Sequence, residues 1–342
     1  MGACIIMLLI LLSVQVPATN AGTVDPVLIA VLDTGIDAWH PEFAPGQIVA
    51  WKDFVSGRPD PYDNNGHGTA TASLVAGENV GSCGTVPKMS FAPGARLAIA
   101  KVLDHQAAGT YEAVTAGIRW AITQNADVIS ISIGGGLPLV GGPLPLDMTA
   151  AIEEARAAGV LVVVAAGNGY LNAGVVPYPS WSAPFGNEPH ALVVGGGTRE
   201  SATLSTTSNT DPDISSWSDN VCIARFNTGG YMVGTGTSLA APLVAGMAAK
   251  LIESGRAAGQ PDDADRIEAL LLYSARNSID APYAREGLGH LWVSQFEDAR
   301  IYATTGTPTA VVRDAYDAQG PHARVDRDFR DAVLLLREAQ DE

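Results

Sequence analysis

Three residues of this chain have the types and settings that catalysis by a serine nucleophile requires: Asp33, His67 and Ser238. Asp33 lies in residues 31–35 (VLDTG), directly after an apolar run, where its carboxylate would sit at the mouth of a sheet. His67 lies between glycines in residues 65–69 (NGHGT), so its ring can project into the same crevice without crowding. Ser238 opens a predicted helix, whose free N–H groups favour negative charge. Together they could perform acyl transfer as an Asp-His-Ser triad.

Each of these residues also has an ordinary structural explanation. An aspartate after a strand is often a turn former or helix cap, and a serine before a helix is usually only its N-cap. A histidine between glycines could be a loop residue or a metal ligand. What favours catalysis is the occurrence of all three residues in the order Asp, His, Ser.

Asn168 adds an independent indication. Residues 163–168 (VVAAGN) predict a buried strand that ends in Gly-Asn. An amide donor at the carboxyl end of such a strand faces the same crevice and could bind an oxyanion.

The elements that must position these residues alternate along the chain. Apolar runs predict buried strands at residues 27–32, 97–103, 128–133, 160–166 and 191–194. Helices are predicted at residues 68–76, 111–123, 147–158, 238–253 and 261–275, with Thr110 as an N-cap and with Gly159, Gly255 and Asn277 at C-terminal ends. Short buried strands joined by helices imply right-handed crossovers, so the predicted fold is α/β, with a doubly wound, mostly parallel sheet flanked by helices.

Taken together, these segments resemble the subtilases, the subtilisin-like serine peptidases. The resemblance runs from about Val27 to Ala303, and four further segments carry it: residues 92–95 (APGA), 126–135 (ADVISISIGG), 177–180 (PYPS) and 215–218 (SSWS). It implies a three-layer α/β/α fold and a serine endopeptidase that works through an acyl-enzyme intermediate.

The resemblance also implies a role for each residue of the site. Ser238 is the expected nucleophile, His67 the general base and Asp33 the residue that orients the imidazole. The Asn168 side chain and the Ser238 N–H are expected to form the oxyanion hole, and the chemistry needs no cofactor. Since no acidic residue follows Asn168, an apolar P1 side chain is expected. The expected substrate-binding residues are Ser132, Ile133, Gly134, Gly109, Tyr111, Ala166 and Gly169.

Several segments depart from the family pattern. Secreted subtilases usually carry an N-terminal propeptide, but here the first core strand is expected at Val27, which leaves no room for one. Ala70 and Leu243 stand where the family often has histidines. The segment of residues 220–236 is short and lacks the Ala-Pro-Gly that the family usually has there. This difference affects the expected loops beside the substrate and leaves the expected triad unchanged.

Metal binding stays open at the level of the sequence. Residues 78–90 form an altered loop where many relatives hold calcium, and its carboxylates are too few to predict a site. Asp60 and Asp63 could also be ligands, but turn residues are the preferred interpretation.

The composition fits a large catalytic domain. The chain has 342 residues, of which 47% are hydrophobic, so it can bury a sizeable core. Its net charge of −16 would repel phosphate backbones and anionic lipids, so we expect no nucleic-acid partner. The expected partner is a peptide or protein substrate, and the expected state is a monomer.

Residues 1–21 carry no charged side chain, and their apolar run is too short to span a bilayer. We interpret them as a signal peptide, which predicts a secreted or periplasmic protein, while a mis-assigned start and a weak membrane anchor are the alternatives. The peptidase domain is then expected at 22–303, and a C-terminal appendage with a terminal helix at 304–342.

Cys83 and Cys222 would remain after removal of the signal peptide. An oxidising compartment could join them, but two isolated cysteines are more often small buried hydrophobes, which is the preferred interpretation.

Two other functions remain as alternatives. The lack of a propeptide and the altered loops fit a dedicated precursor-processing subtilase of narrow specificity. A non-catalytic peptide-binding pseudoenzyme is the second alternative, and the presence of Asp33, His67, Asn168 and Ser238 argues against it.

Overall fold

The computed structural model describes the following residues: 25–133, 144–168, 188, 190–199, 204–209, 212–275, 291, 300 and 303–304. The expected signal peptide, Gly134, Gly169, Asn277 and residues 305–342 lie outside them.

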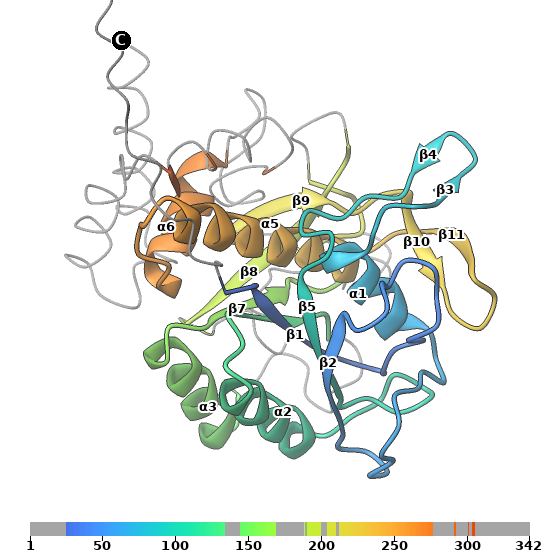
Figure 1. Ribbon diagram of the computed structural model, residues 1–342, viewed down its shortest axis with the longest axis horizontal. Helices are drawn as coiled ribbons and strands as arrows, with labels where there is room; N and C mark the ends of the chain where they lie inside the picture. Colours follow the sequence, from blue (N-terminus) through green and yellow to red (C-terminus); the bar gives the residue numbers. More distant parts are fainter. Residues whose placement is uncertain are drawn as a thin grey trace, which may run out of the picture.

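Seven parallel strands form a single sheet in the order β2-β5-β1-β6-β7-β8-β9 (Figure 1). Side chains of successive residues enter opposite cores: in β1, Leu28 and Ala30 pack on one side and Ile29 and Val31 on the other. Such two-sided burial explains why the strands are continuous apolar runs. The strands are β1 (Leu28–Asp33), β2 (Ile48–Asp53), β5 (Arg96–Lys101), β6 (Val128–Ile131), β7 (Leu161–Ala165), β8 (Ala191–Gly197) and β9 (Ile214–Trp217).

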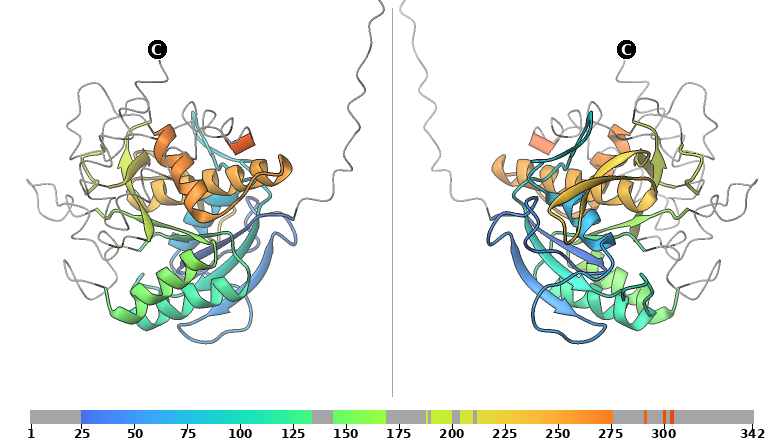
Figure 2. Two further views of the ribbon diagram at one scale, coloured as in Figure 1. Left: turned by 90° about the vertical axis from the view of Figure 1, so that its left-hand side faces the viewer. Right: turned by 90° about the vertical axis from the view of Figure 1, so that its right-hand side faces the viewer.

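Helices cover both faces of the sheet (Figure 2). Two helices, α2 (Tyr111–Thr123) and α3 (Leu146–Ala157), pack on one face. The opposite face is covered by α1 (His67–Ala76), α5 (Thr237–Ala257) and α6 (Ala264–Ser274). These layers confirm the predicted α/β/α fold. No helix within the described ranges is long and apolar enough to cross a membrane.

Most predicted helix limits lie within a few residues of those observed, but the prediction that Gly255 ends a helix was wrong. Thr110 caps α2 as expected, since its side chain accepts a hydrogen bond from the Ala113 N–H at 3.2 Å. Gly255 lies inside α5 because the helix packs closely there: a Cβ atom at this position would come within 3.4 Å of Arg266 Nη1. The left-handed residue that follows the helix is Gly259, with φ +69°.

Two hairpins lie beside the sheet, namely β3 (Ser82–Cys83) with β4 (Val86–Pro87), and β10 (Val221–Arg225) with β11 (Gly230–Gly234). A disulfide joins Cys83 to Cys222 across 139 residues, with a Cα–Cα distance of 5.6 Å. The preferred interpretation of two separate thiols was therefore wrong. The hairpins meet because Gly81 allows close approach: a Cβ atom there would overlap the Tyr231 ring at 1.9 Å.

Candidate active site

Asp33 and His67 are in direct contact at the carboxyl edge of the sheet. Asp33 is the last residue of β1, and His67 is the first residue of α1. His67 Nδ1 lies 2.8 Å from Asp33 Oδ1 and 2.9 Å from Asp33 Oδ2. The carboxylate is completely buried, while the His67 side chain keeps 30% of its surface exposed. The imidazole therefore reaches solvent on one side and a fixed negative charge on the other.

Other donors complete the surroundings of the Asp33 carboxylate. The Thr34 N–H donates to Oδ1 at 2.7 Å, and the Thr71 hydroxyl donates to Oδ2 at 3.1 Å. Thr71 lies one turn after His67 on α1, so one helix face presents both the ring and the hydroxyl. A buried charge needs such partners to remain ionised. Sequence reasoning missed Thr71, whose only signal is a hydroxyl four residues after the histidine.

Asp63 fixes the loop that leads into His67. Its Oδ1 accepts hydrogen bonds from Asn65 N, Gly66 N and Thr34 Oγ1, and its Oδ2 accepts from the backbone and hydroxyl of Thr69. Burial opposes ionisation of Asp63, but these donors outweigh it and lower the pKa of the carboxyl. With these donors around both of its oxygens, Asp63 acts as a loop anchor, in agreement with its interpretation as a turn residue.

The glycine after His67 allows the loop to approach β1 closely. A Cβ atom at Gly68 would lie 2.2 Å from the Gly35 carbonyl oxygen, which no side chain could tolerate. The Gly68 N–H donates to Thr34 Oγ1 at 2.8 Å. These contacts bring the start of α1 onto the residues that directly follow Asp33.

A buried lysine, Lys101, donates hydrogen bonds to the turn that follows Asp33. Lys101 ends β5 beside Asp33, and its Nζ donates to Thr34 O at 2.5 Å, Leu103 O at 2.7 Å and Asn64 Oδ1 at 2.9 Å. Burial lowers the pKa of Lys101, against the opposing charges of nearby carboxylates. The sequence analysis treated Lys101 only as part of an apolar strand, and nothing in its local pattern signals this role.

Asn168 and the start of α5 are also in contact. The Thr237 N–H donates to Asn168 Oδ1 at 2.9 Å, and the Thr237 hydroxyl donates to the same oxygen at 3.1 Å. Because a backbone N–H can only donate, it fixes the amide oxygen toward Thr237 and turns Asn168 Nδ2 away. The amide N–H groups of Asn168 thus remain available to an acceptor beside Ser238.

Ser238 is the second residue of α5 and is partly exposed. Its backbone N–H belongs to the first turn of the helix, where N–H groups have no partner within the helix. Among the residues that the structure describes, Ser238 Oγ makes no hydrogen bond, either to His67 or to any other group. Catalytic hydrogen bonds often tighten only when substrate is bound.

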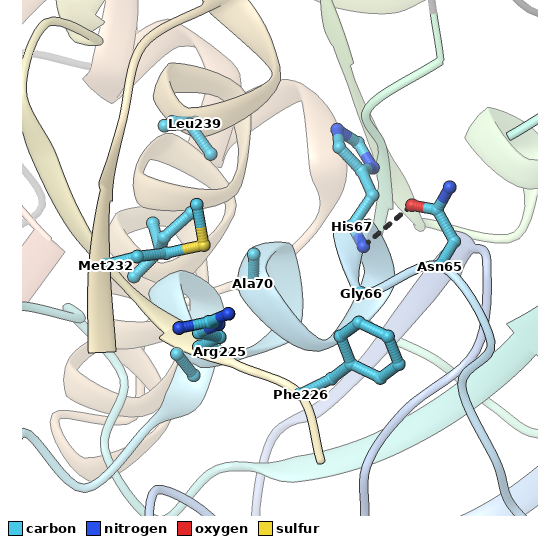
Figure 3. A pocket seen from close by; sticks show the side chains of 10 residues that line it. Asn65, Gly66, His67, Ala70, Arg225, Phe226, Met232 and Leu239 are labelled. Carbon is cyan, nitrogen blue, oxygen red and sulfur yellow. Dashed lines mark hydrogen bonds between the residues drawn. The ribbon is translucent and has the colours of Figure 1, made fainter. Parts of the chain in front are cut away.

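A cavity of about 260 Å³ connects His67 with the start of α5 (Figure 3). Its walls are mostly apolar and come from α1, α5 and the β10–β11 hairpin. They include His67, Ala70, Arg225, Phe226, Met232 and Leu239. Arg225 is exposed, and its guanidinium has no ion-pair or hydrogen-bond partner in the described part of the chain.

The remaining expected site residues lie at the same edge of the sheet where the structure describes them. Ser132 and Ile133 are buried directly after β6, and Ala166 is buried directly after β7. Gly109 forms a bridge with Leu103 after β5, and Tyr111 begins α2. Since parallel strands end at the same edge, all five residues lie at the edge where Asp33 and Asn168 also stand.

Comparisons with known proteins identify the family and support the fold. Residues 25–294 match the model of the subtilase family. The chain is 33% identical to thermitase of Thermoactinomyces vulgaris over 74% of its own length and 86% of that protein. It is 31% identical to subtilisin E of Bacillus subtilis, covering 72% of this chain and 61% of the relative. A crystal structure of a cold adapted subtilisin-like serine proteinase matches with a TM-score of 0.64 and 26% identity, over 78% of this chain and 88% of the other.

The Asp33–His67 contact predicts a raised histidine pKa. Burial lowers the pKa of His67, but the charge and hydrogen bond of Asp33, with the charge of Asp63, raise it above 6.5 overall. The Asp33→Asn substitution should therefore lower the His67 pKa, as measured by NMR titration of the imidazole. The stabilisation from this pair is fully present below the unfolded-state pKa and is lost as pH rises through the folded-state pKa.

The exposed Asp60 offers a matched control, because Asp60→Asn removes the same charge away from the ring. It should leave the His67 pKa unchanged. A His67 pKa that is equal in wild type and in Asp33→Asn would contradict the assigned contact.

Proposed function

The chain is a serine-type endopeptidase of the subtilase family, and we propose that Asp33, His67 and Ser238 form its catalytic triad. The observation that carries this proposal is the contact of His67 Nδ1 with the completely buried Asp33 carboxylate. It assigns the proton-bearing nitrogen of the neutral imidazole to Nδ1 and leaves Nε2 free to accept a proton.

In the first half of the reaction, Ser238 Oγ attacks the carbonyl carbon of a peptide bond while His67 Nε2 takes its proton. Asp33 keeps the proton on Nδ1 in place and stabilises the imidazolium without accepting that proton. His67 then gives its new proton to the amine of the leaving peptide, and an acyl-enzyme remains on Ser238.

In the second half, water attacks the acyl group while His67 Nε2 accepts a proton from the water. His67 then gives this proton to Ser238 Oγ as the bond between Ser238 and the acyl group breaks. His67 must be neutral at the start of each half. Since the pKa of His67 is raised, activity is expected to rise with pH through a value above 6.5.

The oxyanion of both tetrahedral intermediates is stabilised by Asn168 Nδ2 and the Ser238 N–H. Thr237 positions the amide by holding its oxygen, as the two hydrogen bonds to Asn168 Oδ1 indicate. The donor is thus oriented before substrate arrives, and such preorganisation is what gives an oxyanion hole its effect.

The substrate is a peptide or protein in extended conformation. Residues 132–134 pair with its backbone as an added strand, and Gly109 and Tyr111 line the opposite side. Ala166 and Gly169 contribute to a pocket for an apolar P1 side chain. The protein is proposed to be monomeric and secreted or periplasmic, and the processing of a single precursor remains a narrower alternative.

The cavity beside His67 supports a preference on the leaving-group side. His67 protonates the leaving amine and also lines this cavity. The substrate residues after the cleaved bond are therefore proposed to lie toward the cavity. Its apolar walls suit an apolar side chain, and Arg225, which has no ion-pair partner among the described residues, stands among them (Figure 3). In a chain of net charge −16, this cation favours an acidic residue next to the apolar one.

The nucleophile is tested by labelling with a fluorophosphonate probe, which reacts with activated serines. Ser238→Ala and His67→Ala should abolish labelling, because the first removes the nucleophile and the second its base. Ser254→Ala, on the same helix but four turns away, is the control and should label as wild type does. Labelling that persists in Ser238→Ala would refute the assignment.

The oxyanion hole is tested by a double-mutant cycle. Asn168→Ala should lower kcat by about 10²- to 10³-fold with little change in KM, because the lost donor acts in the transition state. Thr237→Val should lower kcat by up to about 10-fold through the lost hydrogen bond to Asn168 Oδ1, while the bond that the hydroxyl accepts from the Gly167 N–H at 3.1 Å is lost in both backgrounds alike. In the Asn168→Ala background, Thr237→Val should have almost no further effect. An equal loss in both backgrounds would show that Thr237 does not act through Asn168.

The leaving-group preference is tested with two peptides that differ only in Glu or Lys at a position after the cleaved bond. Wild type should cleave the Glu peptide about 2- to 5-fold better in kcat/KM, the range of an exposed ion pair. Arg225→Glu should reverse the order. Lys52→Glu makes the same charge change on an exposed part of β2 and should preserve it. A ratio unaltered by Arg225→Glu would exclude this role while leaving the triad intact.

A further inference from the structure

A lysine lies buried in the loop between α1 and β5, outside the catalytic residues. The Lys88 and Glu42 side chains are both completely buried, and Lys88 Nζ lies 4.0 Å from Glu42 Oε2. Nζ also donates to the carbonyl oxygens of Ser73 at 2.6 Å and Met89 at 3.0 Å. The ammonium group is therefore surrounded by oxygen atoms, as a bound cation would be.

The Glu42 carboxylate links three segments at this point. Its Oε2 accepts the Asn79 N–H at 2.9 Å, and its Oε1 accepts the Val80 N–H at 3.1 Å and the Tyr231 hydroxyl at 2.9 Å. Ser73 belongs to α1, which carries His67, and Tyr231 belongs to β11. The charge pair thus connects the loop, the catalytic helix and the β10–β11 hairpin.

Lys88 is still a cation at neutral pH. Burial lowers the pKa of Lys88 to about 8, and the charge of Glu42 limits the fall. An ammonium ion with this pKa remains largely protonated at pH 7.

The same loop is where the resemblance to subtilases left a structural calcium ion open, and its residues do not fit one. Calcium requires six to eight oxygen ligands, usually with several carboxylates. In the described part of the chain, no cluster of three or more Asp, Glu, His or Cys side chains could hold a metal ion. The Lys88 ammonium beside Glu42 would in addition repel a second cation.

We propose that Lys88 is the resident cation of residues 78–90 and holds this loop against α1 without a metal ion. The stabilisation that a bound ion gives depends on its free concentration and grows with the logarithm of that concentration, because the ion can dissociate. A charge carried by the chain itself cannot dissociate. The contribution of this loop to stability is therefore independent of calcium and of chelators.

Thermal unfolding of the full chain tests the proposal, with every sample first inactivated by a fluorophosphonate so that self-digestion does not contribute. The Tm of the wild type should be the same in excess EDTA and in excess calcium chloride. Calcium that raises the wild-type Tm, or EDTA that lowers it, would overturn the proposal.

Two substitutions separate the charge of Lys88 from its volume. Lys88→Met fills the space but leaves Glu42 without its cation, so Tm should fall by about 5–15 °C and should not respond to calcium. Lys88→Ala should also lower Tm, but it opens space beside Glu42 and the two carbonyl groups. One carboxylate and two carbonyl groups are too few ligands for calcium, so calcium should not restore the Tm of this variant either.

Lys52→Ala, at an exposed lysine, serves as the control and should leave Tm unchanged in all conditions. A Lys88→Met variant as stable as wild type, or a Tm that rises with calcium in either Lys88 variant, would refute the role of Lys88 as the cation of this loop. If Lys88→Ala does not fold, the wild-type and Lys88→Met measurements decide the question.

Discussion

The buried charge of Asp33 is the constraint on which the rest of the site depends. An ionised carboxylate without exposed surface must be compensated within the protein. The compensation comes from His67, from Thr71 on the same helix and from the backbone of Thr34. Satisfying one charge therefore fixes where β1 ends, how α1 begins and which way the imidazole faces. The arrangement exists before any substrate arrives.

The sequence predicted those parts of the structure that local pattern controls. Most strands buried on both faces are continuous apolar runs, and the residues of the proposed triad stand in recognisable motifs at the end of β1 and at the starts of α1 and α5. Two sheet strands were missed: β2 is only partly buried, and β9 is buried but has the sequence ISSW, so neither forms a continuous apolar run. The roles of Thr71 and Lys101 were missed because they consist of contacts with segments distant in sequence. The Cys83–Cys222 pairing was missed for the same reason, since only the meeting of two hairpins brings the cysteines together.

Two buried lysines have similar roles in this acidic protein. Lys101 donates to carbonyl groups below the turn that follows Asp33, and Lys88 does so in the loop beside α1. Each replaces lost water with backbone oxygens and lies near carboxylates. Placing positive charge inside also offsets part of the repulsion among the 36 acidic residues. The interior also holds carboxylates, among them Asp33, Glu42 and Asp53, so the two lysines compensate buried negative charge.

The disulfide has a consequence for a peptidase that meets other copies of itself. Five of the seven sheet strands, β5 to β9, lie between Cys83 and Cys222 in sequence. Asp33 and His67 come before this span, and Ser238 comes after it. A single self-inflicted cut anywhere within the span would leave both fragments covalently joined, with the two parts of the triad tethered to each other. The cross-link therefore keeps the two fragments of a nicked chain within one molecule.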